Sequence, residues 1–185
     1  MYTRKDPYFN KAKQEGFRAR SSYKLLEIQK KYKIIKPNNS VLDIGCAPGS
    51  WLQVVKKLTK GKIFGIDIVA IKSISGVTFI QQDITTFKSK EKFNVVISDI
   101  APKTTGIRNI DQQKSFDLTK QSFEVAKKLL KKNGNFIVKT FQSQETLILI
   151  KEIKPMFKLV KTFVPKSTRE SSKELYIIAL EFNPS

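Results

Sequence analysis

The stretch Val41-Leu-Asp-Ile-Gly-Cys-Ala-Pro-Gly-Ser-Trp51 decides the fold of this chain. It opens with a short run that is apolar apart from Asp43, as in a buried strand, and Gly45 allows a tight turn where that strand ends. The residues from Ser50 to Thr59 follow with the pattern of a helix, which Lys60-Gly61 ends. A strand, a glycine turn and a helix in this order are typical of the first βα unit of an open α/β sheet.

The rest of the chain repeats this alternation of strands and helices. We therefore predict an α/β fold with a seven-stranded, mostly parallel sheet and helices on both faces. The last two strands leave no room for a helix between them, so the last strand should run antiparallel. The segment before the fourth strand has room for a short helix at most. The expected strands cover residues 41–45, 63–67, 77–81, 95–98, 136–139, 157–163 and 175–182, and the expected helices cover residues 21–32, 50–59, 113–132 and 146–153.

The length of 185 residues suits a single domain, 1–185. Within it we expect a catalytic α/β core over residues 41–185. Residues 1–40 are rich in lysine and arginine and short of long apolar runs, so we interpret them as a basic N-terminal extension that includes the helix 21–32.

The amino-acid composition limits which classes of function this chain can have. Lysine and arginine outnumber acidic residues 35 to 16, a net charge of +19, which predicts a polyanionic partner unless the genome simply favours lysine. The chain has no histidine and one cysteine, which argues against a histidine base, a disulfide framework and a zinc site. No apolar run approaches a membrane span or a signal segment. We expect a cytoplasmic protein without a bound metal or a membrane partner.

Acidic residues follow the strands at the edge where open α/β sheets bind ligands. Asp67 lies 22 residues after Gly45, about where an acid binds two ribose hydroxyls, and Asp83 could accept from an adenine amino group. Taken singly, Asp43 and Asp67 also fit a buried capping acid and a turn acid. Pro48 lacks the amide hydrogen that a pyrophosphate would use. A nucleoside without a pyrophosphate fits best, and S-adenosylmethionine is the common cofactor of that kind.

Two loops indicate which group receives the methyl. Ser98-Asp-Ile-Ala-Pro102 lacks the Pro-Pro-aromatic sequence needed to methylate a base nitrogen. Cys46, the only candidate for a carbon-methylating nucleophile, lies in the cofactor loop and is expected to be a packing residue. Methylation of a hydroxyl needs alignment with the methyl and a base. In the absence of histidine, Lys139 is the best candidate base, because it ends an apolar strand at the ligand-binding edge.

Five segments, in order along nearly the whole chain, resemble the signatures of the FtsJ family of ribose 2′-O-methyltransferases, also called RrmJ. The resemblance implies a Rossmann-like, class I S-adenosylmethionine-dependent methyltransferase fold. The chain departs from the family at Ser50, where the family usually has a second glycine, and in the shorter segment between Asp83 and Val95. The five segments are residues 16–28, 41–51, 98–102, 136–142 and 167–176.

By this resemblance the family's catalytic Lys-Asp-Lys-Glu tetrad falls on Lys24, Asp99, Lys139 and Glu174, with Lys139 as the general base. The implied enzyme is an S-adenosylmethionine-dependent RNA (ribose-2′-O)-methyltransferase, acting on a uridine of large-subunit (23S-type) ribosomal RNA. Two alternatives remain: a tRNA anticodon-loop methyltransferase of the same family, and a non-catalytic RNA-binding ribosome-assembly factor. The intact tetrad argues against the second.

The expected partner is RNA, because its 2′-hydroxyl distinguishes it from DNA. Basic residues precede Lys24 and Glu174 in the chain, and we expect them to bind RNA phosphates. We expect a monomer that binds no DNA. The expected RNA-binding residues are Arg18, Arg20, Lys166, Arg169 and Lys173, and the expected cofactor-binding residues are Asp43, Gly45, Gly49, Trp51, Asp67, Asp83 and Asp99.

Overall fold

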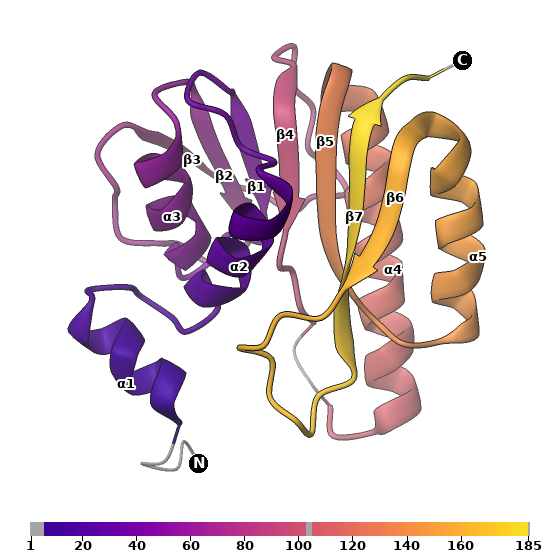
Figure 1. The fold of residues 1–185 in the computed structure, drawn as a ribbon, viewed down its shortest axis with the longest axis horizontal. Helices are drawn as coiled ribbons and strands as arrows, with labels where there is room; N and C mark the ends of the chain where they lie inside the picture. The colour runs from indigo at the N-terminus through magenta and orange to yellow at the C-terminus, as the bar shows by residue number, and fades with distance from the viewer. Residues whose placement is uncertain (1–5, 103–104, 185) are drawn as a thin grey trace.

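The computed structural model describes residues 6–102 and 105–184. Its elements follow one another in the predicted alternation of strands and helices (Figure 1). The strands are β1 (Val41–Ile44), β2 (Ile63–Asp67), β3 (Val77–Gln81), β4 (Phe93–Ser98), β5 (Leu130–Phe141), β6 (Phe157–Phe163) and β7 (Glu174–Phe182), and the helices are α1 (Pro7–Gln14), α2 (Ser22–Tyr32), α3 (Ser50–Leu58), α4 (Arg108–Leu129) and α5 (Gln144–Ile153), followed by the single turn η1 (Lys154–Met156).

The described strands form one sheet in the order β3-β2-β1-β4-β5-β7-β6. Strands β1 to β6 share one direction, while β7 pairs antiparallel with both of its neighbours, β5 and β6. The strand order changes direction at β1, which has β2 on one side and β4 on the other. The predicted fold class, including the single antiparallel last strand, is confirmed.

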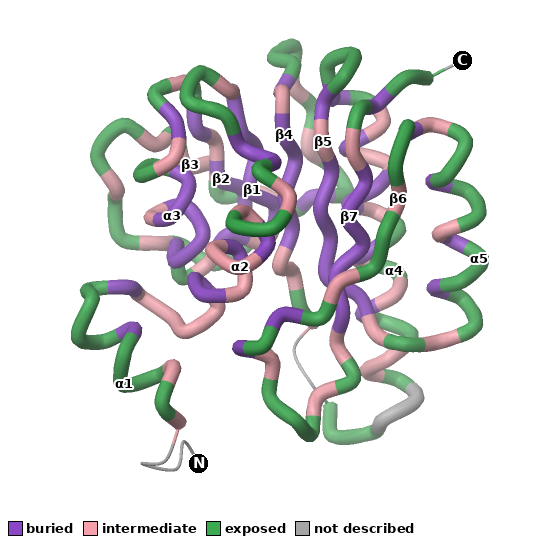
Figure 2. Tube along the Cα trace, in the orientation of Figure 1, coloured by how far each residue is buried: buried purple, intermediate pink, exposed green. Residues whose placement is uncertain are grey.

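The pleat of the sheet divides the core into two layers. Ile137 and Tyr176 point to the face that α2 and α3 cover, and Val138 and Ile177 point to the face that α4 and α5 cover. The central strands are buried almost along their whole length, with exposed helix surfaces outside them (Figure 2). Side chains at the ends of these strands therefore stand on a rigid base. In the described part of the chain, no helix has the length and apolar character to span a membrane.

The boundary between α4 and β5 differs from the prediction, which placed a helix over 113–132 and ended it at Asn133-Gly134. Helix α4 starts at Arg108 and ends at Leu129, and Leu130 already pairs with Phe93 of β4. Asn133 has a φ of 62° and lies where the register shifts, so it forms a bulge inside β5. Pairing with β4 outweighs the helical pattern of this segment, and asparagine tolerates the left-handed backbone.

Helix α1 was not predicted, although two signals for it are present. The Asp6 side chain accepts from the Phe9 amide at 3.2 Å as an N-cap, and Pro7 occupies the first helical position. Between β3 and β4 the chain forms no helix, as the short spacing predicts.

Gly45 lets the end of β1 lie against the loop that follows β4. Its φ is +71°, and a Cβ built there would lie 2.5 Å from Cβ of Ile100. Gly76 has a similar φ of +80° but open space around it. We predict that Gly76→Ala lowers the free energy of unfolding by about 1–2 kcal/mol, the cost of the backbone conformation. Gly45→Ala should cost about 1–3 kcal/mol more because of the steric clash. Urea denaturation of both variants measures the difference, and equal losses would contradict the close approach.

Candidate active site

Strand register brings three side chains together at the end of the sheet. Ser98 of β4 pairs with Val138 of β5, and Lys139 pairs with Tyr176 of β7. Asp99 therefore lies opposite Lys139. The Lys139 Nζ is 2.7 Å from the backbone oxygen of Asp99 and 3.2 Å from its Oδ1, which also accepts a 2.7 Å bond from the Tyr176 hydroxyl. Lys139 is only 7% exposed.

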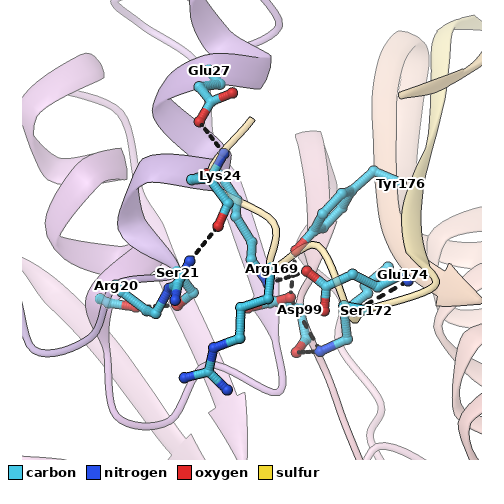
Figure 3. Close-up of polar contacts among 12 residues, drawn as sticks. Arg20, Ser21, Lys24, Glu27, Asp99, Arg169, Ser172, Glu174 and Tyr176 are labelled. Atoms are coloured by element: carbon cyan, nitrogen blue, oxygen red, sulfur yellow. Dashed lines mark hydrogen bonds and ion pairs between the residues drawn. The ribbon is translucent and has the colours of Figure 1, made fainter. Parts of the chain in front are cut away.

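A second ion pair lies beside this group. Lys24 of α2 binds Oε1 of Glu174, the first residue of β7. Figure 3 shows this pair next to Asp99 and Tyr176. The structure thus brings together all four predicted catalytic side chains, although Lys24 and Glu174 are 150 residues apart in sequence. Tyr176 was not singled out from the sequence, where a tyrosine in an apolar strand is an ordinary core residue.

A cavity of about 520 Å³ lies at the same edge, between the loops that follow β1, β2, β3 and β4. Gly45, Asp67, Asp83 and Asp99 line it, as predicted for a cofactor site. The Asp67 carboxylate accepts 2.8 Å bonds from the amides of Ala47 and Val69. These bonds fix the carboxylate, and each oxygen keeps a further acceptor position for a hydroxyl.

Asp83, on the loop after β3, and Gln121, on α4, both line this cavity. One oxygen of Asp83 accepts from the amide of Thr85 at 2.8 Å and from its hydroxyl at 2.7 Å, and these bonds lower the pKa of the Asp83 carboxyl. Gln121 comes from α4, and its buried Oε1 has no hydrogen-bond partner among the described residues. Gln121 could not be singled out from the sequence, because only the packing of α4 beside the loop reveals its position.

Three predicted cofactor residues are not among those that line the cavity. Gly49, with a φ of 101°, is the N-cap of α3. The Trp51 indole donates to the Ser21 carbonyl at 2.8 Å, and its ring centroid is 5.8 Å from that of Tyr176. Trp51 thus supports the site from within the α2–α3 layer. Its contact with the cofactor, like that of Gly49, stays a prediction.

Asp43 is the third, at the end of β1. It is fully buried, and neither carboxylate oxygen has a hydrogen-bond partner in the described part of the chain. Burial raises the pKa of Asp43 well above its usual value, and the neighbouring charges of Asp99 and Asp67 add to the rise. Asp43 is therefore a buried acid whose surroundings disfavour its charged form, and its contact with the cofactor stays a prediction.

The Arg18 guanidinium is already bound within the protein. It donates to the backbone oxygens of Pro48 at 3.0 Å, Lys72 at 2.8 Å and Ser73 at 3.1 Å. These bonds tie the N-terminal extension to the loop before α3 and to the loop after β2. A phosphate that binds Arg18 would have to compete with these three carbonyl oxygens. The sequence pattern of basic residues does not reveal that Arg18 is already bound.

The other predicted RNA-binding residues fall into two groups. Lys166 and Lys173 are exposed on the loop before Glu174. Arg20 and Arg169 both form ion pairs with Asp6. The described residues contain no cluster of three or more acidic or cysteine side chains that could hold a metal ion.

Comparisons with known proteins agree with this geometry. A family model described as FtsJ-like methyltransferase matches residues 17–182. Relatives named ribosomal RNA large subunit methyltransferase E include one from Methanosphaerula palustris, 41% identical over 96% of this chain and 91% of its own length. Another, from Coxiella burnetii, is 42% identical with the same coverage.

Solved structures show the same fold. A Plasmodium falciparum protein proposed to be a ribosomal RNA methyltransferase has a TM-score of 0.81 and 32% identity, over 91% of this chain and 100% of its own. A Streptococcus mutans protein proposed to be a methyltransferase, solved in complex with SAH, has a TM-score of 0.58 over 87% of this chain and 95% of its own. At 14% identity, it supports the fold alone.

The raised pKa of Asp43 should make the free energy of unfolding depend on pH. Because the pKa of Asp43 is raised in the folded chain, the folded chain keeps a proton that the unfolded chain releases above about pH 4. The release of this proton on unfolding lowers the free energy of unfolding as the pH rises from about 4 towards the pKa of the folded state. Asp43→Asn removes the cost, so its stability relative to wild type should increase with pH, by at most about 1.4 kcal/mol per pH unit. Urea denaturation between about pH 4 and pH 8 measures this trend.

The control for loss of one negative charge is Glu152→Gln, at an exposed acid on α5. A difference between Asp43→Asn and wild type that stays constant with pH would show that Asp43 is ionised when folded.

Proposed function

The chain belongs to the FtsJ-like methyltransferase family, and we propose that it transfers the methyl group of S-adenosylmethionine to a ribose 2′-hydroxyl of large-subunit ribosomal RNA. One observation carries the proposal. Asp99 lines the cavity and, through both its backbone oxygen and its carboxylate, holds the buried amine of Lys139. A cofactor in the cavity would thus lie next to a candidate base.

The cavity suits S-adenosylmethionine. Its volume of about 520 Å³ is within the range of small-ligand sites. Gly45 keeps its floor free of a side chain, and the Asp67 carboxylate has acceptor positions for ribose hydroxyls. The ionised Asp83 and the unpartnered oxygen of Gln121 offer acceptors for an adenine amino group. When bound, this cofactor supplies an electrophilic methyl on a sulfonium.

The geometry around Lys139 suits proton acceptance. To accept a proton, the Lys139 amine must first leave the ammonium form of its ion pair with Asp99. The neutral amine then has two hydrogens and one lone pair. Two acceptors of Asp99 can take both hydrogens, which directs the lone pair to an incoming hydroxyl. We propose that Lys139 Nζ takes the proton of the 2′-hydroxyl while the hydroxyl oxygen bonds the methyl carbon and the sulfonium–methyl bond breaks. The resulting ammonium would be stabilised by the Asp99 carboxylate, which Tyr176 holds in place.

The acceptor follows from charge and from the relatives. A net charge of +19 favours a polyanion, and relatives above 40% identity are named for the large ribosomal subunit. We propose a uridine of that RNA as the acceptor, with no role for DNA, and a monomer that works in the cytoplasm. A tRNA or an assembly role without catalysis would be an alternative outcome of the experiments below.

Lys139→Met tests the base. It keeps an unbranched side chain of similar length in a buried position and removes the amine, so methyl transfer should fall at least about a hundredfold. Binding of S-adenosylmethionine, measured by calorimetry, should persist. Lys161→Met on the exposed surface of β6 is the matched control and should keep the wild-type rate. A wild-type rate in Lys139→Met would remove Lys139 from its role.

The substrate is tested by transfer of labelled methyl to large ribosomal subunits and to bulk tRNA, side by side. We expect label in the subunits and, after nuclease digestion, in a 2′-O-methylated nucleoside. Label in tRNA would overturn the ribosomal substrate and keep the enzyme. Label in neither, with cofactor still bound, would favour a non-catalytic role.

Asp83→Asn and Gln121→Leu test the adenine end of the cavity. Asparagine can still accept from Thr85, so the loop should keep its shape while the charge is lost. Each variant should weaken S-adenosylmethionine binding by about 1–3 kcal/mol, roughly 5- to 150-fold. The control is Gln113→Leu, on α4 but outside the cavity. Unchanged affinity in a calorimetric titration would exclude that residue from the site.

A further inference from the structure

An acidic residue of the N-terminal extension lies between two arginines beside the candidate active site. Asp6 Oδ2 binds Arg20, just before α2, and lies 3.5 Å from Nη2 of Arg169, on the loop between β6 and β7. Arg20 also donates to the backbone oxygen of Ser167 on that loop. Two guanidinium groups from distant parts of the chain thus converge on one carboxylate.

This arginine pair lies at the same place as the tetrad. Arg20 precedes Lys24 by four residues and Arg169 precedes Glu174 by five, and Lys24 and Glu174 are paired with each other. In Figure 3 Arg169 extends across the view of that ion pair, and Arg20 lies farther from Glu174 and Asp99, next to Ser21. We therefore expect phosphates of an RNA strand that places a ribose at Lys139 to pass near these arginines.

The segment that carries Asp6 is held by few contacts. Helix α1 lies at the edge of the molecule (Figure 1), and Ala12 is its one buried residue. Its other links include the Tyr8 ring, which packs against Tyr23 at 5.5 Å and under Arg20 at 5.6 Å. The Arg169 side chain is 54% exposed, whereas those of Arg20 and Asp6 are 14% and 12% exposed. An anion from solvent therefore meets Arg169 first and reaches Arg20 only by displacing Asp6.

We propose that Arg20 and Arg169 form a phosphate subsite for the RNA substrate, and that the Asp6 carboxylate occupies this subsite until an RNA phosphate displaces it. The inference rests on the proposed function for the identity of the ligand. A phosphate offers more acceptor oxygens than a carboxylate and can bridge two guanidinium groups. Displacement of Asp6 also removes the ion pairs that hold the start of α1, so RNA binding should release that helix. Asp6 thereby acts as an internal competitor that weakens binding of incorrect anions.

Asp6→Asn is the decisive variant. Asparagine is as good an N-cap as aspartate, so the start of α1 keeps its cap while the competing charge is lost. Affinity for a fluorescein-labelled single-stranded oligoribonucleotide, measured by anisotropy, should rise about fivefold or more. The salt dependence should also steepen, by about 0.7 in log–log slope for each additional RNA phosphate that the variant binds.

Two further variants separate this effect from net charge. Glu170→Gln removes an equal charge from the exposed neighbour of Arg169 and should change affinity less than about twofold. Arg169→Gln should abolish most of the gain when combined with Asp6→Asn. Unchanged or lower affinity in Asp6→Asn, or a gain that persists without Arg169, would overturn the proposal.

A measurement on the unaltered chain gives an independent test. Hydrogen exchange of the α1 amides, residues 7–14, should become faster when the oligoribonucleotide binds, and slower or unchanged exchange would contradict the release of Asp6. Neither experiment requires methyl transfer. If the subunits and tRNA receive no label but these results hold, the proposed activity fails while the phosphate subsite stands.

Discussion

The site depends on Asp99, whose backbone and side chain organise two neighbouring strands. Its position is set by the parallel pairing of β4 with β5 and by the antiparallel pairing of β5 with β7. These registers place Lys139 and Tyr176 on one face of the sheet, directly opposite each other, because cross-strand partners point to the same side. A shift of one residue in either strand would turn these side chains into the α4–α5 layer. The antiparallel β7 is therefore a requirement of the site as well as of the fold.

Much of this arrangement could be predicted from the sequence. The strand ends follow from apolar runs that stop at an acid or a lysine, and parallel strands bring such ends to one edge. Tyr176 and Gln121 could not be predicted, because their roles depend on register and on helix packing. The boundary of α4 was wrong for a related reason: the pairing of Leu130 with Phe93 is a tertiary contact that a local helical pattern does not contain.

The basic residues also show what cannot be predicted from the sequence alone. The net charge predicts a polyanion, but it does not distinguish an arginine that is available from one that is already bound. The Arg18 guanidinium donates to three backbone oxygens, and Arg20 is paired with Asp6. Lys166 and Lys173, in contrast, are exposed. Only the folded structure separates the arginines that are already bound from the lysines that are exposed.

The short connection between β3 and β4 has a consequence for the other end of the site. No helix lies there, and Ile84, Thr85 and Gln121 line both the cavity and a second hollow of about 660 Å³. The end of the cavity that we propose for the adenine is thus lined by the loop after β3 and by α4. Because the Asp83 carboxylate is fixed by Thr85, loop shape and base recognition are coupled. Under the proposed function, selectivity for the base would rest on the Asp83 charge and the Gln121 amide, since apolar walls accept any ring of similar size.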